Sequence, residues 1–163
     1  KPEIDTADYD LPLQEHKACF VTLYLEDSLR GCIGTLEAQQ ALVNAVVDAS
    51  HSAAFQDPRF SPLSADEFHA LETSISVLSI PKPIHVTDET ELLTQLRPGI
   101  DGLILKEGNQ RGTFLPSVWA QLPEPVDFLA QLKRKAGLPA NYWSPSIVVS
   151  RYTTEIFSTQ KNE

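Results

Sequence analysis

Two apolar segments near the start of the chain have the composition of β-strands. Residues 18–25 read Ala-Cys-Phe-Val-Thr-Leu-Tyr-Leu, which is rich in β-branched and aromatic side chains, and a strand pattern resumes over 32–36. Glu26, Asp27 and Ser28 between them are turn-forming residues. The pattern predicts a β-hairpin with its tip at Asp27 and Ser28.

The next segment, from Gln39 to Phe55, has helical periodicity. Its apolar residues recur every three or four positions, at Leu42, Ala45, Val46, Ala49 and Ala53. The spacing predicts one helix with a single buried stripe, ended by Pro58 and Pro62, which lack backbone donors. Ser64 and Glu67 have the spacing of a capping box and predict a short helix through Leu71.

Strand-like and helix-like segments are mixed along the rest of the chain. Strands are predicted over 74–80, 102–105 and 147–157, and helices over 88–96, 116–122 and 126–136. The order begins with a hairpin and not with a βαβ unit. It therefore predicts an α/β chain of α+β-like type, with a mixed, largely antiparallel sheet and packed helices. Residues 1–17 are expected to form an irregular arm, and 158–163 a frayed end.

Composition narrows the class of protein. The chain of 163 residues is long enough for a domain with its own core, and its net charge of -9 disfavours nucleic acid and anionic membranes as partners. It has neither a membrane-span-length apolar run nor a signal peptide, so we expect a cytoplasmic protein. Methionine is absent and the first residue is Lys1, so we expect the natural start to lie upstream.

The two cysteines, Cys19 and Cys32, form neither a disulfide framework nor a metal cluster. With the predicted tip, Cys32 lies opposite Leu23 and about 13 Å from Cys19, too far for a disulfide. We expect two free thiols in a reducing compartment. Cys32 would then share a buried face with Leu23, Val21 and Cys19. The sequence contains no zinc signature, and it leaves any cofactor unidentified.

Candidate chemistry gathers in the motif Leu29-Arg30-Gly31-Cys32-Ile33-Gly34-Thr35. One interpretation is an enzyme in which Cys32 is a nucleophile, activated by Arg30 or His51, with the glycine amides holding an oxyanion. Asp48, three residues before His51, could orient that histidine. The alternative is that Cys32 packs as a small hydrophobe and that the Asp48–His51 pair lies on a helix surface.

A second interpretation is a binding module for a small anionic ligand. Arg30, Arg59 and Arg111 lie in loop-like contexts and could converge on the anion through their planar guanidinium groups. The other residues of this candidate ligand site are Gly31, Gly34, Thr35 and Asp57. Alternatively, each arginine pairs with an internal acid such as Asp57 or Asp101. A third interpretation, an adaptor that positions partner proteins, would leave no catalytic signature.

Seven ordered blocks carry a resemblance to a known family. They are 18–23, 29–35, 57–60 (Asp-Pro-Arg-Phe), 75–79, 101–105 (Asp-Gly-Leu-Ile-Leu), 111–116 (Arg-Gly-Thr-Phe-Leu-Pro) and 135–138 (Lys-Ala-Gly-Leu). The chain resembles the AMMECR family, whose bacterial and archaeal members are called AmmeMemoRadiSam system protein A. The Leu-Arg-Gly-Cys-Ile-Gly block is the most specific of the seven.

The resemblance implies an AMMECR-type domain over 18–157, built as two sub-domains with a cleft near the Arg30–Cys32 motif. Family members carry a helix ahead of the first strand, and the sequence of residues 1–17 predicts none. It also has Ser117 where the family has glutamine, and Ser74 where an acidic residue is common. The family's biochemical activity is not established. Its name links it to a Memo-type dioxygenase-like protein and a radical SAM protein, which the resemblance implies as partners.

Overall fold

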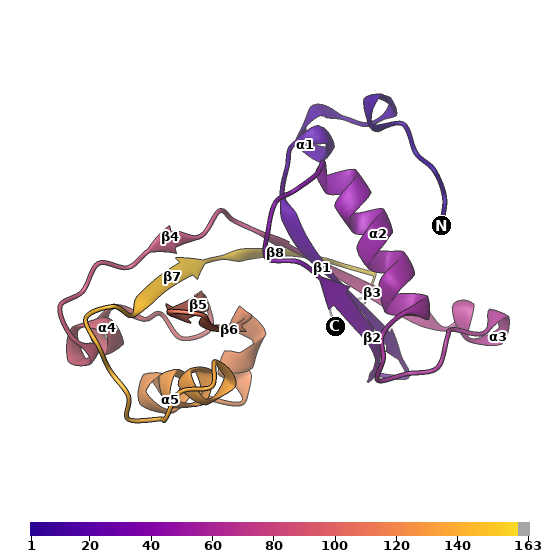
Figure 1. The fold of residues 1–163 in the computed structure, drawn as a ribbon. Helices are drawn as coiled ribbons and strands as arrows, with labels where there is room; N and C mark the ends of the chain where they lie inside the picture. Colours follow the sequence, from indigo (N-terminus) through magenta and orange to yellow (C-terminus); the bar gives the residue numbers. More distant parts are fainter. Residues whose placement is uncertain (160–163) are drawn as a thin grey trace. The chain divides into compact units, whose positions relative to one another are not determined.

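The computed structural model describes residues 1–159. These residues fold as two compact units, which we describe separately (Figure 1). The first unit contains Lys1–Ser79 and the C-terminal segment from Glu155, and the second contains Ile80–Thr154. No helix among the described residues has both the length and the apolar character needed to cross a membrane.

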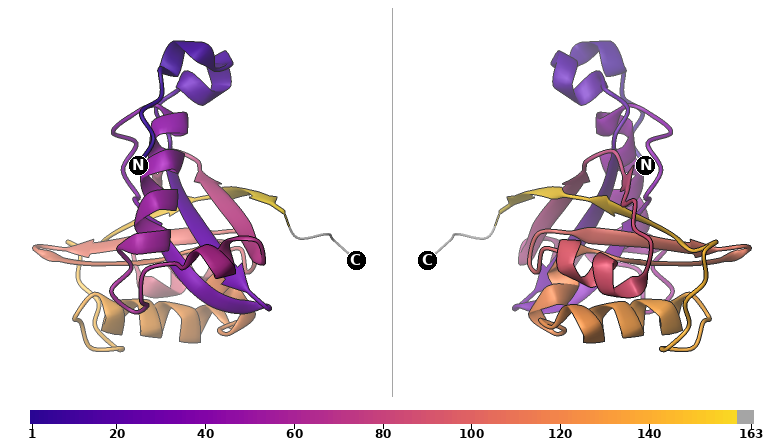
Figure 2. Two further views of the ribbon diagram at one scale, coloured as in Figure 1. Left: turned by 90° about the vertical axis from the view of Figure 1, so that its right-hand side faces the viewer. Right: turned by 90° about the vertical axis from the view of Figure 1, so that its left-hand side faces the viewer.

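The first unit is built on a four-stranded sheet. Its strands are β1 (Ala18–Leu25), β2 (Ser28–Gly34), β3 (Leu71–Leu78) and β8 (Thr154–Ser158), in the order β2-β1-β3-β8. Both β2 and β3 pair with β1 in antiparallel fashion. Helix α2 (Leu42–Phe55) lies across one face of this sheet, as two further views show (Figure 2). The predicted helix is confirmed, although it starts three residues later than expected.

The core of the first unit lies between α2 and the β1–β2 hairpin. It contains Cys19, Val21, Leu23, Leu42, Ala45, Ala49 and Ala53. The helix contributes mainly alanines, which lets its backbone approach the sheet closely. A Cβ atom added at Gly31 would lie only 2.2 Å from the carbonyl oxygen of Ala53. Glycine is therefore required at position 31 by the packing of β2 against α2.

Short helices complete the first unit. The expected irregular arm contains η1 (Thr6–Asp8) and α1 (Leu11–Gln14), and α3 (Ala65–Phe68) follows the predicted Ser64–Glu67 capping box. That box is confirmed, but α3 ends at Phe68 because β3 begins at Leu71. The sequence predicts a frayed end over 158–163, of which residues 160–163 lie outside the described residues. Thr159 still donates its backbone N–H to the Thr73 carbonyl oxygen.

The hairpin corrects two expectations about Cys32. Its tip is Glu26–Asp27, both with positive φ, so Leu25 pairs with Ser28. The register then shifts between Tyr24 and Leu23, because Arg30 is an extra, bulged residue. Cys32 consequently lies opposite Thr22, and the expectation that it faces the core with Leu23 is wrong. A change of one residue in register exchanges the two faces of a strand.

The second unit contains another antiparallel four-stranded sheet. Its strands are β4 (Lys82–Pro83), β5 (Gly102–Glu107), β6 (Gln110–Phe114) and β7 (Val148–Tyr152), in the order β4-β7-β5-β6. The helices are α4 (Glu89–Gln95), the 3₁₀ helix η2 (Pro116–Ala120) and α5 (Pro125–Lys135). The core of this unit includes Leu103, Leu105, Leu129 and Leu132, with Trp119 stacked on Phe128 at 3.7 Å between ring centroids.

The predicted fold class is confirmed: helices pack on antiparallel sheets within two units. The predicted final strand over 147–157 is divided at Thr153 into β7 and β8. These two strands belong to different sheets, so the last segment of the chain serves both units.

Candidate functional site

The candidate site lies in the first unit, where the loop after α2 meets the free edge of β2. β2 is an edge strand, and Cys32 directs its backbone N–H and C=O away from β1. The N–H donates to Asp57 Oδ2 at 2.9 Å, and Arg59 Nη2 donates to the Cys32 carbonyl oxygen at 3.3 Å. Two side chains of this loop therefore satisfy the strand edge, as a neighbouring strand would.

Asp57 holds Arg59 in a fixed orientation. The buried carboxylate accepts the Arg59 backbone N–H at 3.1 Å, Nε at 3.0 Å and Nη2 at 2.7 Å. The Arg59 guanidinium, and then the Cys32 N–H, hold the pKa of Asp57 well below its usual range. The side chain of Arg59 is about half exposed, and Nη1 has no hydrogen-bond partner among residues 1–159.

A second arginine–carboxylate pair lies beside the first. Arg30 donates from Nε to Glu67 Oε1 at 2.8 Å and from Nη2 to Glu67 Oε2 at 3.1 Å. This pairing, together with hydrogen bonds from Ser64, lowers the pKa of Glu67 to about 2. Arg30 Nη1 is buried and has no partner in the part of the chain that the structure describes. The sequence revealed Glu67 only as a capping residue, and its reach to Arg30 depends on the tertiary structure.

Phe60 links the two pairs. The guanidinium carbon of Arg30 lies 5.9 Å from the centroid of the Phe60 ring, and that of Arg59 lies 5.4 Å away. Contacts of this kind attract a cation to the aromatic face. Both arginines are thus held through the Nε–Nη2 edge and through Phe60.

The thiol of Cys32 is half-buried on the face of the sheet opposite α2. Its Sγ lies 3.2 Å from Thr22 Oγ1, and either atom could be the donor. Asp57 chiefly raises the pKa of the Arg59 guanidinium, and Cys32 makes the smallest contribution. Cys19, by contrast, is fully buried, and burial raises the pKa of its thiol to about 11. Both cysteines are free, as predicted.

The histidine proposed as a partner for Cys32 is not brought to it. His51 belongs to α2, on the opposite side of the sheet from the Cys32 side chain, and its ring packs against Phe55 at 5.2 Å between centroids. Asp48 forms an ion pair with Lys1 and accepts a hydrogen bond from Gln40 at 2.9 Å. Lys1, and then Gln40, lower the pKa of Asp48, so its principal contacts are not with His51.

The remaining predicted residues lie at three places. Gly31 packs on α2 as described, whereas Gly34 and Thr35 line a separate small cavity of about 170 Å³, which Asp48 and Ser52 also line. Arg111 belongs to the second unit, where it pairs with Lys106 across β5 and β6. The site built in the first unit therefore contains Arg30, Cys32, Asp57 and Arg59, with Thr22, Phe60 and Glu67 added by the structure.

The chain is thus a two-unit α+β protein in which the Arg30–Cys32 motif lies on an edge strand of the first unit's sheet. A family model described as AMMECR1 matches residues 1–157. The chain belongs to this family.

Relatives in archaea are similar along most of their length. A protein of Methanothermobacter thermautotrophicus is 38% identical over 154 residues, covering 91% of this chain and 79% of the relative. A protein of Methanocaldococcus jannaschii is 37% identical, covering 91% and 76%. The crystal structure of an uncharacterised protein from Pyrococcus horikoshii aligns with a TM-score of 0.85 and 34% identity, over 96% of this chain and 81% of that one.

Proposed function

We propose that this chain binds a small ligand at Cys32 and that Arg59 holds an anionic group of that ligand. The observation that carries the proposal is the fixed guanidinium of Arg59, whose Nη1 remains uncommitted beside a half-buried thiol. A guanidinium held in this way loses little conformational entropy when an anion binds. Thr22 Oγ1 adds a hydroxyl at the same place.

Binding is favoured over nucleophilic catalysis by the contacts of the thiol. The polar side chain found at Cys32 Sγ is a threonine hydroxyl, which is a poor general base, and His51 lies across the sheet. Arg30 and Arg59 each pair with one carboxylate, so the site carries no net charge from these four groups. Recognition would therefore depend on short-range hydrogen bonds from Arg59 and not on long-range attraction.

The test compares an anionic and a neutral alkylating agent at Cys32. Iodoacetate carries a carboxylate and iodoacetamide does not, so their rate ratio reports whether the site attracts a small carboxylate. Replacing Arg59 with glutamine should lower the ratio roughly fivefold, the effect of one charge about 4 Å away in a water-like medium. An unreactive carboxylate, acetate, should slow the iodoacetate reaction in the wild type.

The matched control is Arg97→Gln. Arg97 also pairs with a buried aspartate through Nε and Nη2, but it belongs to the second unit. The R97Q variant should keep the wild-type ratio at Cys32. An unchanged ratio in R59Q would refute the proposal.

An adaptor role is the second candidate, with Memo-type or radical SAM proteins as the partners. It is favoured by exposed apolar side chains next to the Arg30–Glu67 pair: Leu29 precedes Arg30 and is 41% exposed, and Phe68 follows Glu67 and is 66% exposed. Interface anchors are commonly aromatic. Binding of a purified Memo-type protein by the wild type but not by Phe68→Ser would support this role, and no binding by either would count against it.

A further inference from the structure

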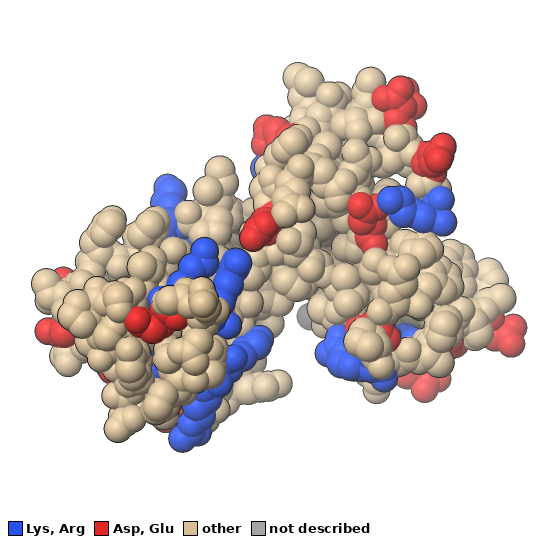
Figure 3. All heavy atoms as spheres, in the orientation of Figure 1, with Lys and Arg blue, Asp and Glu red and all other residues tan. Residues whose placement is uncertain are grey.

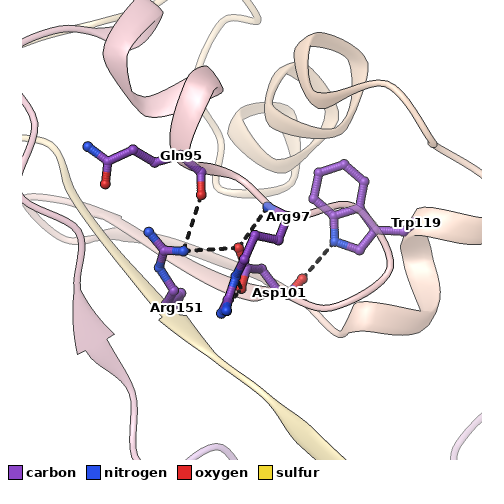
Figure 4. Close-up of polar contacts among 5 residues, drawn as sticks. All are labelled: Gln95, Arg97, Asp101, Trp119 and Arg151. Carbon is purple, nitrogen blue, oxygen red and sulfur yellow. Dashed lines mark hydrogen bonds and ion pairs between the residues drawn. The ribbon is translucent and has the colours of Figure 1, made fainter.

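A buried carboxylate in the second unit is shared by two arginines (Figure 4). Asp101 is fully buried and immediately precedes β5. Arg97 donates to it from the backbone N–H at 2.9 Å, from Nε at 2.9 Å and from Nη2 at 2.6 Å. Arg151 donates from Nη1 at 3.4 Å and also to the Gln95 carbonyl oxygen at 3.1 Å. The guanidinium groups therefore lie side by side at one acid.

This cluster has an excess of positive charge. Within residues 1–159, neither arginine has a carboxylate partner other than Asp101. Lys82 adds a third cation, because it lies directly opposite Arg151 in the β4–β7 pair. Like charges facing each other across two strands are destabilising unless something of opposite charge compensates them. Arg97 and Arg151 share one carboxylate and Lys82 lies opposite Arg151, so these four groups together carry two net positive charges.

The donors needed to bind an anion are present and accessible. The side chain of Arg97 is 48% exposed and that of Arg151 is 24% exposed. In the described part of the chain, Arg97 Nη1 and the Nε and Nη2 atoms of Arg151 have no hydrogen-bond partner. The Asp101 carboxylate holds the two guanidinium groups together, which pre-organises these donors.

The charge of the second unit supports an anionic ligand here. Residues 80–154 contain eight of the thirteen Lys and Arg residues and only seven of the twenty-two acids. Figure 3 shows Lys and Arg side chains gathered on the visible surface of this unit. The unit is thus slightly basic within a strongly acidic chain.

We propose that Arg97 and Arg151, with Lys82 beside them, form a binding site for the phosphate dianion of a small phosphorylated ligand. Two net positive charges match a dianion, whereas a monocarboxylate would neutralise only one of them. Guanidinium groups also suit phosphate, because adjacent N–H donors can bind two of its oxygens at once. Its residues belong to the second unit, whereas those at Cys32 belong to the first.

The experiment is a titration of the wild-type protein with inorganic phosphate, followed through the arginine Nε–H signals in NMR spectra. The signals of Arg97 and Arg151 should shift with saturation. In Arg151→Gln, Asp101 keeps its three hydrogen bonds from Arg97, so the fold should survive, as the backbone amide spectrum will show. Phosphate affinity should fall about tenfold to a hundredfold, the range for one lost hydrogen bond to a charged group.

Two comparisons make the result specific. Lys106→Gln removes the same charge from an exposed position on β5 outside the cluster, and it should leave phosphate affinity within about twofold of the wild type. Acetate should bind more weakly than phosphate. Shifts spread over all exposed cations, unchanged affinity in R151Q, or tighter binding of acetate would each overturn the proposal. An effect confined to Arg59 would also overturn it while leaving the site at Cys32 intact.

Discussion

Asp57 accepts the backbone N–H of Cys32 at 2.9 Å, although the two residues are 25 positions apart. This contact joins the loop after α2 to the edge of β2 and sets the position of Arg59 relative to the cysteine. The two most chemically distinctive blocks of the sequence, 29–35 and 57–60, therefore act as one structure.

The two thiols should differ strongly in reactivity. Cys19 is fully buried and its pKa of about 11 leaves roughly one thiol in a thousand ionised at pH 8, whereas Cys32 is partly exposed. Mass-spectrometric mapping with limiting iodoacetamide should show Cys32 modified first in the native protein. The difference should disappear in denaturant. Equal rates in the native state would show that Cys32 is as protected as Cys19.

Acid should weaken the contact between Arg30 and Glu67. The pKa of Glu67 falls from 4.5 to about 2 on folding, so its ionised form stabilises the native state above pH 4.5, and this contribution is lost as the pH falls towards 2. Glu67→Gln keeps a residue suited to the capping box but removes the charge. The melting temperatures of wild type and E67Q should therefore differ at pH 7 and converge near pH 2.

The neighbouring acid supplies the control for this measurement. Asp66 is exposed on the same helix, α3, and Asp66→Asn should follow the wild-type pH dependence closely. A difference in melting temperature between wild type and E67Q that stays constant from pH 7 to 2 would contradict the role assigned to the Arg30–Glu67 pair.

A methyl group at position 31 should disrupt the contact between β2 and α2. The added Cβ of Gly31→Ala would lie 2.2 Å from a backbone oxygen of Ala53, which cannot move without displacing the helix. We expect a loss of about 3 kcal/mol in the free energy of unfolding, measured by urea denaturation. Gly108→Asn is the control, because its side chain meets open space and asparagine tolerates the positive φ there. Similar losses in both variants would argue against close packing at Gly31.

In the second unit, Lys133 of α5 and its partner Glu89 differ in exposure, so removing one or the other should change stability by different amounts. Lys133 is fully buried and donates to Glu89 at 2.7 Å and to the Ala140 carbonyl oxygen at 3.2 Å, whereas Glu89 is one-third exposed. Glu89→Gln leaves a buried ammonium without its counter-ion and should lower the free energy of unfolding by about 3 kcal/mol. Lys133→Met leaves a carboxylate that water can reach, so it should lower the free energy of unfolding by less than Glu89→Gln does. Thermal unfolding of the two variants decides the order, and the reverse order would be inconsistent with these contacts.

Local patterns predicted the elements well where the signal lies within a few residues. The apolar stripe of α2 and the Ser64–Glu67 capping box are confirmed because both depend on spacings of three or four residues. The last strand was harder to predict, since its composition does not show that β7 and β8 join different sheets. Pairing of strands far apart in sequence depends on the packing of the whole unit.

The arginines show the same division between local and distant information. The alternative in which they pair with internal acids named Asp57 without assigning it to an arginine, and the structure pairs it with Arg59, two residues away. It did not identify Glu67 as the partner of Arg30, or Arg97 and Arg151 as the partners of Asp101. Arg30 and Glu67 are 37 residues apart, and no local spacing connects them.

The sequence by itself determined the α+β class, the two free thiols and the family, because composition, periodicity and ordered motifs contain that information directly. Only the tertiary structure decided which way Cys32 faces. A turn at Glu26–Asp27 and the bulge at Arg30 place its thiol beside Thr22 and away from the core. The physical reason is the two-residue repeat of a strand: one extra residue reverses every side chain after it, and nothing in the local composition of 18–36 specifies that residue.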